Sequence, residues 1–386
     1  MRTSSEQTAP EMARLEGARP PARARASVPI PIRPQGSHAR SAVGEKREPM
    51  PNPNGWVAAC YSHELKRGSV LTIPFMEQEL VLYRTASGIA RAIDPYCPHM
   101  GAHLGNGGKV VGEDLVCPFH GLAYGPDGAC VRTGNGEKPP RAALTLRHVH
   151  EINNAILVWV HHDNLPPQWE FPAFDLADRS RPGYSTHHLT GYFLDPGENS
   201  ADVVHFGWLH GFKNPRMTAK TDGHQLEISF AASWRGLAFN GHFLHYGVAC
   251  SYAELAMPKF GLVVAVPVFC TPVAPFQWTL RWFDVMRIDA LDRWPSLPRR
   301  LVYALLGPFT HRWVRHVMVA DFPIWAQRKY LKHPKLTASE RPLAIYRRWA
   351  AQFYPSGTGP DTEAADEPFG HDNAPPAHAT ERLAGE

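Results

Sequence analysis

The sequence predicts an α+β protein in which a small all-β domain precedes a larger domain built around an antiparallel sheet. From Gly55, short apolar runs alternate with Gly, Asn, Asp and Pro turns over about 110 residues, a pattern typical of a small β domain. After a proline-rich stretch at Leu165, alternating strand-like runs and helical periodicity follow one another. We therefore expect domains at 54–164 and 165–354, with a disordered arm (1–53) and a disordered acidic tail (355–386).

Each domain has its own expected elements. Strand-like runs of the first domain are separated by turn residues, and the second domain contains both period-two and helical patterns. The strands expected in the first domain are 56–60, 70–74, 80–84 and 155–161. Those expected in the second are 225–234, 237–246 and 277–288, with helices at 199–210, 299–324 and 342–353.

The composition is that of an ordinary globular protein, with 386 residues, 44% hydrophobic and 20% charged. The longest apolar runs, 260–270 and 301–309, are shorter than the roughly 20 residues that a membrane span needs. The Arg- and Pro-rich start lacks the apolar core of a secretory signal, which leaves a disordered arm or an organellar transit peptide. We expect a cytoplasmic protein without transmembrane helices.

Charge is distributed unevenly along the chain. The net charge of +4 combines a basic body with a tail in which residues 355–386 contain seven acids and one arginine. The basic clusters are interspersed with acids and accompany no nucleic-acid-binding motif. These features favour an acidic redox partner over DNA or RNA.

Two short segments place cysteines and histidines at metal-ligand spacing. They read Cys97-Pro98-His99 and Cys117-Pro118-Phe119-His120, so each loop offers one thiolate and one imidazole. Zinc usually takes paired cysteines or paired histidines from one segment, whereas this mixed arrangement suits a two-iron cluster. His103 is a competing imidazole nearby, but we leave it out because its offset differs. Six scattered cysteines also do not indicate a disulfide framework.

This first constellation resembles the Rieske [2Fe–2S] proteins. The resemblance implies that Cys97 and Cys117 bind one iron of the cluster and that His99 and His120 bind the other. Respiratory-chain Rieske proteins carry an additional cysteine in each loop, and Ala102 and Phe119 occupy those places here. The departure points to the oxygenase and ferredoxin kind of Rieske protein.

A second constellation lies in the larger domain, at His205 and His210. Two histidines five residues apart would point about 140° apart on an ideal helix, so the helix must bend or end between them. Gly207 and Gly211 give the backbone freedom to do so. With one carboxylate from elsewhere, the histidines could hold a mononuclear Fe(II) as a 2-His-1-carboxylate triad. The candidate acids are Asp284, Asp289, Asp292 and Asp321.

The segment Asn199-x-x-Asp202-x-x-His205-x₄-His210 resembles the signature of Rieske non-heme iron oxygenases. The resemblance implies that Asp202 is a bridge for electrons, which accepts hydrogen bonds from an iron-binding histidine and from a cluster histidine of a neighbouring subunit. It gives Asn199 a supporting role. The alternative interpretation of Asp202 is an ordinary acid on the surface of a helix.

The C-terminal segment from Asp321 to Tyr354 is similar to the 3-ketosteroid 9α-hydroxylase and cholesterol 7-desaturase group. The resemblance implies a helix-grip-like catalytic domain in which Asp321 is the third iron ligand rather than a simple helix cap. It further implies a head-to-tail homotrimer, supplied with electrons from NAD(P)H by a flavin reductase, a ferredoxin or both. Such an enzyme uses O₂ to hydroxylate or desaturate a bulky hydrophobic substrate, here a steroid or sterol.

Three alternatives share parts of these motifs. A secondary-metabolite tailoring oxygenase has the same architecture, and the α subunit of an aromatic-ring dihydroxylating dioxygenase has the same metal motifs. A Rieske ferredoxin without substrate chemistry is the non-oxygenase alternative. The sequence does not choose between hydroxylation and desaturation, and it does not identify the residues of the substrate pocket.

Overall fold

The computed structural model describes residues 47–355 and 359. Most of the predicted arm and nearly all of the predicted acidic tail therefore lie outside the described residues. Within 47–53, Nη1 of Arg47 donates a hydrogen bond of 3.2 Å to the carbonyl oxygen of Ala326. The guanidinium of Arg47 also lies over the Phe276 ring, 5.3 Å from its centroid. This end of the arm is thus in contact with the C-terminal half of the chain.

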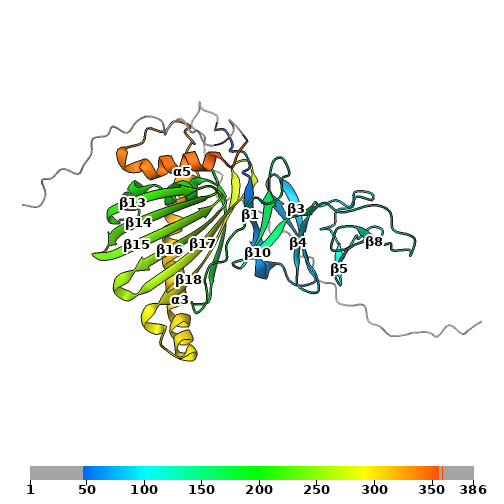
Figure 1. The fold of residues 1–386 in the computed structure, drawn as a ribbon, viewed down its shortest axis with the longest axis horizontal. Coiled ribbons are helices and arrows are strands. Elements are labelled where there is room, and N and C mark those ends of the chain that lie inside the picture. Colours follow the sequence, from blue (N-terminus) through cyan, green and yellow to red (C-terminus); the bar gives the residue numbers. More distant parts are fainter. Residues whose placement is uncertain (1–46, 356–358, 360–386) are drawn as a thin grey trace, which may run out of the picture. The chain divides into compact units, whose positions relative to one another are not determined.

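Residues 55–160 form three small antiparallel sheets (Figure 1). The four strands expected in this region are present, with ends that differ by at most two residues. The first sheet has the order β1 (Gly55–Tyr61), β11 (Ala155–Val160), β10 (Val149–Ile152). The second is β2 (Val70–Phe75), β3 (Gln78–Arg84), β4 (Ala90–Ile93), β9 (Leu146–Arg147). The third is β5 (Lys109–Val111), β6 (Asp114–Val116), β7 (Ala123–Tyr124), β8 (Cys130–Arg132).

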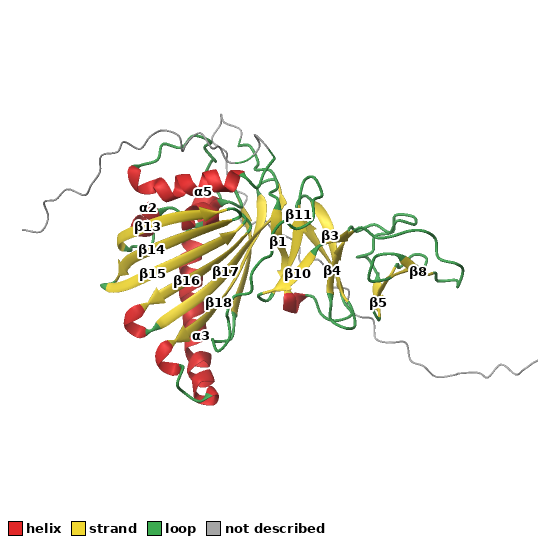
Figure 2. Cartoon of the chain, viewed as in Figure 1, coloured by secondary structure: helices red, strands yellow, loops and turns green. Residues whose placement is uncertain are grey.

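The second half of the described chain is built on a seven-stranded antiparallel sheet (Figure 2). The three strands expected here are found with the predicted bounds, as β14 (Gln225–Trp234), β15 (Leu237–Tyr246) and β18 (Gln277–Ile288). The strand order is β12–β18–β17–β16–β15–β14–β13. The remaining strands are β12 (Gly183–Thr190), β13 (Lys213–Asp222), β16 (Cys250–Met257) and β17 (Leu262–Ala274).

Strand β17 explains the long apolar run that the sequence shows around residue 265. Val264, Val266 and Val268 belong to the core that also contains helix residues. Ala265 and Phe269, on the opposite face, belong to a core shared with β1 and β11. A strand buried on both faces is apolar at consecutive positions rather than at alternate ones.

Two helices cover this sheet. α3 (Ser296–Ala320) crosses one face and contacts β12 and β18, whereas α5 (Arg341–Ala351) packs on β13 and β14 (Figure 2). A long helix held against an antiparallel sheet is the helix-grip-like arrangement expected, so the predicted α+β fold class is confirmed. In the described part of the chain, no helix combines the length and the hydrophobicity needed to cross a bilayer.

The single helix expected over 199–210 is wrong, because two short helices occupy the segment. α1 (Asp195–Ser200) ends first, and α2 (Val203–Trp208) begins after Asp202. Asp202 has an extended backbone, with φ −95° and ψ 103°, and its carboxylate accepts from the N–H groups of Val204 and His205. This N-cap stops one helix and starts the next. The helix expected over 299–324 is likewise divided at Asp321, where α4 (Phe322–Trp325) follows α3.

Candidate metal centres

The two cysteine loops of the first constellation have the same backbone hydrogen bonds. The N–H of Cys97 donates to the carbonyl oxygen of Ala102, and the N–H of Gly101 donates to that of Cys97, both at 2.9 Å. At Cys117 the corresponding distances are 2.8 and 3.2 Å. One loop precedes β5 and the other joins β6 to β7, so the β5–β8 sheet adjoins both loops, whose cysteines make equivalent backbone hydrogen bonds.

The thiols of this site face inward and the imidazoles face outward. Cys97 and Cys117 are each 3% exposed, whereas His99 and His120 are exposed. The two imidazole rings meet edge to face with centroids 4.8 Å apart. Burial raises the pKa of the Cys117 thiol, which a metal ion would reverse by binding the thiolate. The four side chains thus fit a cluster with a buried sulfur-bound iron and an exposed nitrogen-bound iron.

Sequence reasoning missed Tyr124, which lies on β7 directly after the second loop. Its hydroxyl is 2.9 Å from Sγ of Cys97, and the residue is fully buried. A hydrogen bond to a ligand sulfur stabilises negative charge on the cluster and so raises its reduction potential. The only signal in the sequence was a tyrosine on the strand that follows a cysteine loop.

His103 is not brought into the cluster site. Its Nε2 lies 3.2 Å from Oε2 of Glu79, and its Nδ1 accepts a hydrogen bond from the N–H of Gly105 at 3.1 Å. Both ring nitrogens of His103 therefore have partners within the protein. This agrees with leaving His103 out of the set of cluster ligands.

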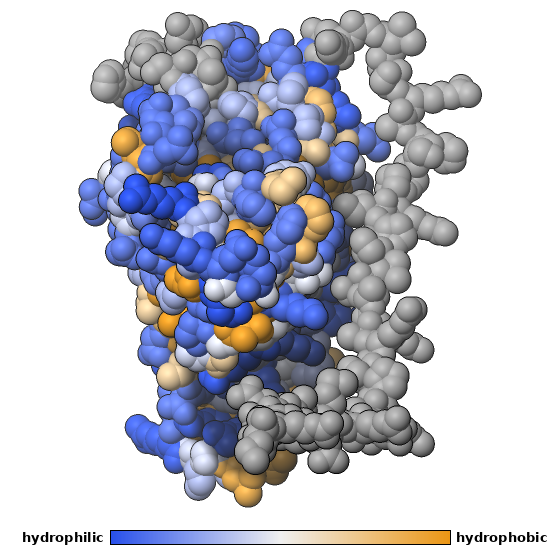
Figure 3. Space-filling view, turned by 90° about the vertical axis from the view of Figure 1, so that its right-hand side faces the viewer, coloured by the Kyte–Doolittle hydropathy of each residue, from blue (hydrophilic) through white to orange (hydrophobic). Residues whose placement is uncertain are grey.

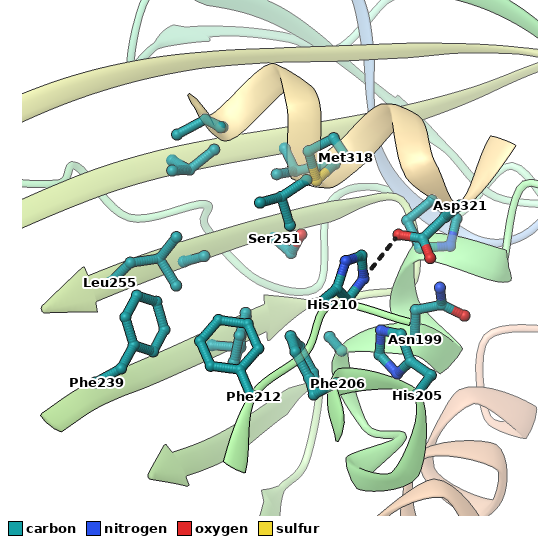
Figure 4. Close-up of a pocket in the computed structure, with 18 of the residues that line it drawn as sticks. Asn199, His205, Phe206, His210, Phe212, Phe239, Ser251, Leu255, Met318 and Asp321 are labelled. Atoms are coloured by element: carbon teal, nitrogen blue, oxygen red, sulfur yellow. Dashed lines mark ion pairs between the residues drawn. The ribbon is translucent and has the colours of Figure 1, made fainter. Parts of the chain in front are cut away.

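The second constellation brings His205, His210 and Asp321 together (Figure 4). One ligand atom from each residue lies within 4.8 Å of the other two. Nε2 of His210 is 3.5 Å from Oδ2 of Asp321. Nδ1 of His205 donates to the carbonyl oxygen of Asp202 at 2.7 Å, which leaves Nε2 as the nitrogen with a free lone pair.

The end of α2 removes the angular objection to this pair of histidines. The helix stops at Trp208, so His210 lies beyond it and its ring centroid comes within 5.1 Å of that of His205. Gly211 follows with φ 73°, a left-handed conformation that glycine adopts readily. Gly207 remains inside α2.

The carboxylate of Asp321 has the properties of a metal ligand. The residue is 5% exposed, and its side chain does not cap α4. Among the described residues, Oδ1 has no hydrogen-bond partner. A buried carboxylate oxygen without a partner is destabilising unless a cation binds there, so the three residues fit a divalent metal ion.

The other candidate acids have different partners. Oδ1 of Asp284 lies 2.5 Å from Nδ1 of His311. Asp289 and Asp292 both face Arg287, at 2.9 and 3.9 Å. The structure therefore places none of these three acids beside His205 and His210.

A buried ion network fixes α1, which carries Asn199 beside His205 (Figure 4). Glu198 forms an ion pair with Arg347 on α5, whose Nη2 donates to Oε2 of Glu198 at 3.2 Å, and Arg328 pairs with both Glu198 and Asp195. Glu198 is 3% exposed, and the two arginines hold its pKa below the usual value despite burial. The network was not predicted, because its members are far apart in the sequence.

An apolar pocket lies between α3 and the sheet and ends at the three candidate ligands (Figure 4). The empty space within it, including the solvent at its mouth, is about 870 Å³. The polar lining includes His245, whose Nε2 is hydrogen-bonded to the hydroxyl of Ser200 at 2.8 Å. Burial lowers the pKa of His245 to about 4. The larger apolar lining residues are Phe206, Phe212, Phe239, Phe243, Leu255, Trp313 and Met318.

Comparisons with known proteins agree with both halves of the fold. Residues 55–145 match the Rieske [2Fe-2S] domain, and residues 158–354 match the 3-Ketosteroid 9alpha-hydroxylase C-terminal domain. Cholesterol 7-desaturase of Xenopus laevis is 28% identical over 340 residues, which cover 78% of this chain and 72% of that protein. The oxygenase component of 3-ketosteroid-9-alpha-monooxygenase from Mycolicibacterium smegmatis is 23% identical over 330 residues, or 78% and 82% of the two chains.

Similar solved structures show the fold alone. Dicamba monooxygenase bound to dicamba has a TM-score of 0.57 at 16% identity, covering 78% of this chain and 97% of the other. NdmA of Pseudomonas putida CBB5 with caffeine has a TM-score of 0.59 at 18% identity, covering 76% and 89%. The N-terminal β region and the sheet with its long helix are thus arranged as in characterised enzymes.

Proposed function

The chain belongs to the 3-ketosteroid 9alpha-hydroxylase family of Rieske oxygenases, and we propose that it is the terminal oxygenase that hydroxylates or desaturates a steroid or sterol. The observation that carries the proposal is the apolar pocket whose inner end is formed by His205, His210 and Asp321. A large aliphatic substrate would bury its apolar surface against the pocket walls and would place one part of its carbon skeleton next to the three metal-binding residues. Both reactions occur among the named relatives.

The proposed sites assign two metal groups to this chain. Cys97, His99, Cys117 and His120 would hold the [2Fe–2S] cluster, and His205, His210 and Asp321 would hold Fe(II). When bound, the cluster supplies single electrons and the mononuclear iron activates O₂. The carbonyl oxygen of Asp202 fixes the His205 ring so that Nε2 faces the site.

The walls of the pocket give the substrate an apolar, uncharged surface. His245 is neutral at physiological pH because its pKa is about 4, and Ser200 fixes its ring. Asn199 lies at the ligand-bearing end, where its amide could orient a polar group close to the iron. We propose that these groups position the substrate, whereas the phenylalanine and leucine side chains exclude water from the reacting C–H bond.

We also propose a head-to-tail homotrimer in which electrons cross between subunits through Asp202. Oδ2 of Asp202 is 3.7 Å from Nδ1 of His205. The side chain of Asp202 is 24% exposed, so a neighbouring subunit can reach it. Exposed apolar residues lie at each end of this route: Val204, Trp208 and Leu209 near Asp202, and Tyr96, Met100 and Phe119 near the cluster histidines. The face on the β5–β8 side is mainly hydrophilic, with scattered hydrophobic groups (Figure 3).

Two different apolar patches that contact each other make a heterologous interface, which closes into a ring when the rotation allows it. The exposure of His99 and His120 would admit either a neighbouring Asp202 or an external electron donor. As an oxygenase component, the protein needs electrons from outside, and we propose NAD(P)H, a flavin reductase and, where required, a ferredoxin as the source. All six cysteines lie in the described part and none of them forms a disulfide, which supports our assignment to the cytoplasm.

The test is turnover by the iron-reconstituted protein with a surrogate reductase, NAD(P)H and O₂. The panel contains sterols, ketosteroids and small aromatic compounds, and products are identified by mass. We expect a steroid or sterol product with one added oxygen atom or with two hydrogens removed. A product with two added hydroxyl groups from an aromatic compound alone would identify a ring-dihydroxylating enzyme, and iron in the cluster alone would identify a ferredoxin.

A further inference from the structure

Helix α3 carries a row of exposed apolar side chains on the side away from the pocket. Leu297, Leu301, Leu305 and Phe309 follow one another at intervals of four residues and are 65–70% exposed. Residues four apart lie on the same side of a helix, so these four form one stripe, called here the α3 stripe. An exposed apolar row of this size indicates a surface that is covered by a partner.

The charged residues of α3 itself are all arginines, one of which, Arg299, is paired with Asp178. The 25 residues of α3 contain four arginines and no aspartate or glutamate. Arg300 and Arg312 are exposed next to the stripe, and Trp294 is 48% exposed just before the helix. The two acids that precede α3, Asp289 and Asp292, are both paired with Arg287. A helix face with an apolar stripe and flanking arginines complements a partner that has an anionic surface and an apolar interior.

A hollow next to the substrate pocket reaches the α3 stripe at Phe309. Phe309 and Trp313 of α3 line it together with residues at the ends of β14 to β17. It shares Phe239, Leu255 and Trp313 with the substrate pocket, so the two spaces adjoin. On the β16–β17 turn beside it, Phe260 is 51% exposed and follows Lys259. The shared side chains thus stand between the hollow, at one end of the stripe, and the pocket that reaches the candidate iron site.

We propose that the α3 stripe inserts into the surface of an anionic lipid bilayer and that the substrate enters the pocket from the bilayer through this hollow. The inference rests on the proposed function, because a sterol or steroid partitions into lipid. Leucine and phenylalanine would lie below the headgroups, while arginine and Trp294 remain at the level of the lipid phosphates. A second copy of the chain on the stripe would instead cover the opening at Phe309.

The binding test uses the full-length, metal-loaded protein and sedimentation with two kinds of vesicle, phosphatidylcholine alone and phosphatidylcholine with phosphatidylglycerol. The test variant is Leu301→Glu/Leu305→Glu, because neither leucine lines the pocket or the hollow. The matched control is Ile89→Glu/Val131→Glu, which places the same charges at residues 52% and 49% exposed on other elements. We expect binding to anionic vesicles by wild type and control, and at least about tenfold weaker binding by the stripe variant.

The activity test presents one substrate either within the anionic vesicles or dissolved in cyclodextrin. We expect the stripe variant to lose about tenfold in rate with vesicle-borne substrate and to match wild type with dissolved substrate. Equal vesicle binding by the wild type and the stripe variant would overturn the inference. So would turnover of dissolved substrate by a wild type that does not bind vesicles, or a smaller oligomer in the stripe variant. Vesicle binding without turnover of any steroid or sterol would overturn the proposed function instead.

Discussion

Asp202 uses two different groups for two different contacts. Its carboxylate accepts from the N–H groups at the start of α2, and its carbonyl oxygen accepts from Nδ1 of His205. The orientation of the His205 ring therefore depends on the backbone, whereas helix capping and negative charge depend on the side chain. Asparagine keeps an oxygen for capping and removes only the charge.

We predict that Asp202→Asn and Asp202→Ala both retain the two metal groups and lose turnover by about 10- to 100-fold. The alanine variant should in addition lose about 1 kcal/mol of stability, because it removes the N-cap. Iron content, coupled product formation and urea unfolding measure these effects. Loss of the mononuclear iron with normal electron transfer would contradict the bridging role.

Asp321→Ala should remove the mononuclear iron and leave the cluster intact. The buried Oδ1 without a protein partner indicates that this carboxylate belongs to the metal site. We expect iron to fall from about three to about two atoms per chain with an unchanged Rieske absorption spectrum. Asp289→Ala, which alters an exposed acid paired with Arg287, is the control. An unchanged iron count in Asp321→Ala would assign the third ligand elsewhere.

His245 should make the folded state less stable in acid. Its pKa is about 4 in the folded protein and near 6.5 in the unfolded chain, so only the unfolded chain binds a proton between these values. The free energy of unfolding therefore decreases as pH falls from about 6.5 to 4, by roughly 3 kcal/mol in total. Urea unfolding across this range should give a flatter pH dependence for His245→Gln, and parallel curves for the two proteins would refute the assignment.

At the scale of elements, the two cluster loops are alike in hydrogen bonding and different in surroundings. Gly101 and Gly121 both have positive φ, of 72° and 67°. A Cβ atom on Gly101 would have nothing within 4 Å, whereas one on Gly121 would lie 2.8 Å from Cα of Gly134. The second loop is therefore packed closely against the backbone at Gly134.

This difference predicts unequal effects of alanine in the two loops. Gly101→Ala should cost only the backbone strain, about 1–2 kcal/mol. Gly121→Ala has the same strain and must also separate two backbone segments, so it should lower the temperature at which the Rieske spectrum disappears considerably further. Thermal melts followed in the visible range provide the comparison, and equal melting temperatures would show that the loop at Gly134 yields easily.

The strands of the larger domain were predicted unevenly from the sequence. β14, β15 and β18 were predicted with their bounds, whereas β17 was not, because its two prolines interrupt the apolar run and proline is unusual inside a strand. The proposed cluster ligands stand out in the sequence because each loop supplies its pair within four residues. The choice of Asp321 among four candidate acids needed the family resemblance. The pocket-lining residues could not be predicted, because they depend on which face of the sheet meets α3, and no local sequence pattern shows this.

At the scale of the whole molecule, the proposed trimer makes each active unit from two chains. The cluster of one subunit would serve the iron of the next, so the two metal sites need not be intact in the same chain. The apolar patches around Asp202 and around the cluster histidines support this arrangement.

Complementation between two inactive variants tests it. Cys117→Ser removes the cluster site, and Asp321→Ala removes the mononuclear site. Co-expressed in equal amounts, they should recover about a quarter of wild-type activity, because one in four interfaces joins an intact cluster to an intact iron site. The two proteins purified separately and mixed without subunit exchange are the control. No recovery in co-expressed trimers would place the electron route within one chain.

Strand β17 limits how this enzyme can evolve towards other substrates. Val266 and Val268 line the pocket, while their neighbours Ala265 and Phe269 complete the core shared with β1 and β11. A substitution that shifts this strand to reshape the pocket also disturbs the contact with the N-terminal sheet. The other side of α3 is exposed at Leu297, Leu301, Leu305 and Phe309 rather than packed in a second core, so replacing Trp313 or Met318 changes the cavity at lower cost to stability. Substrate range in this lineage should therefore diversify first through α3, with β17 remaining the slowly changing wall.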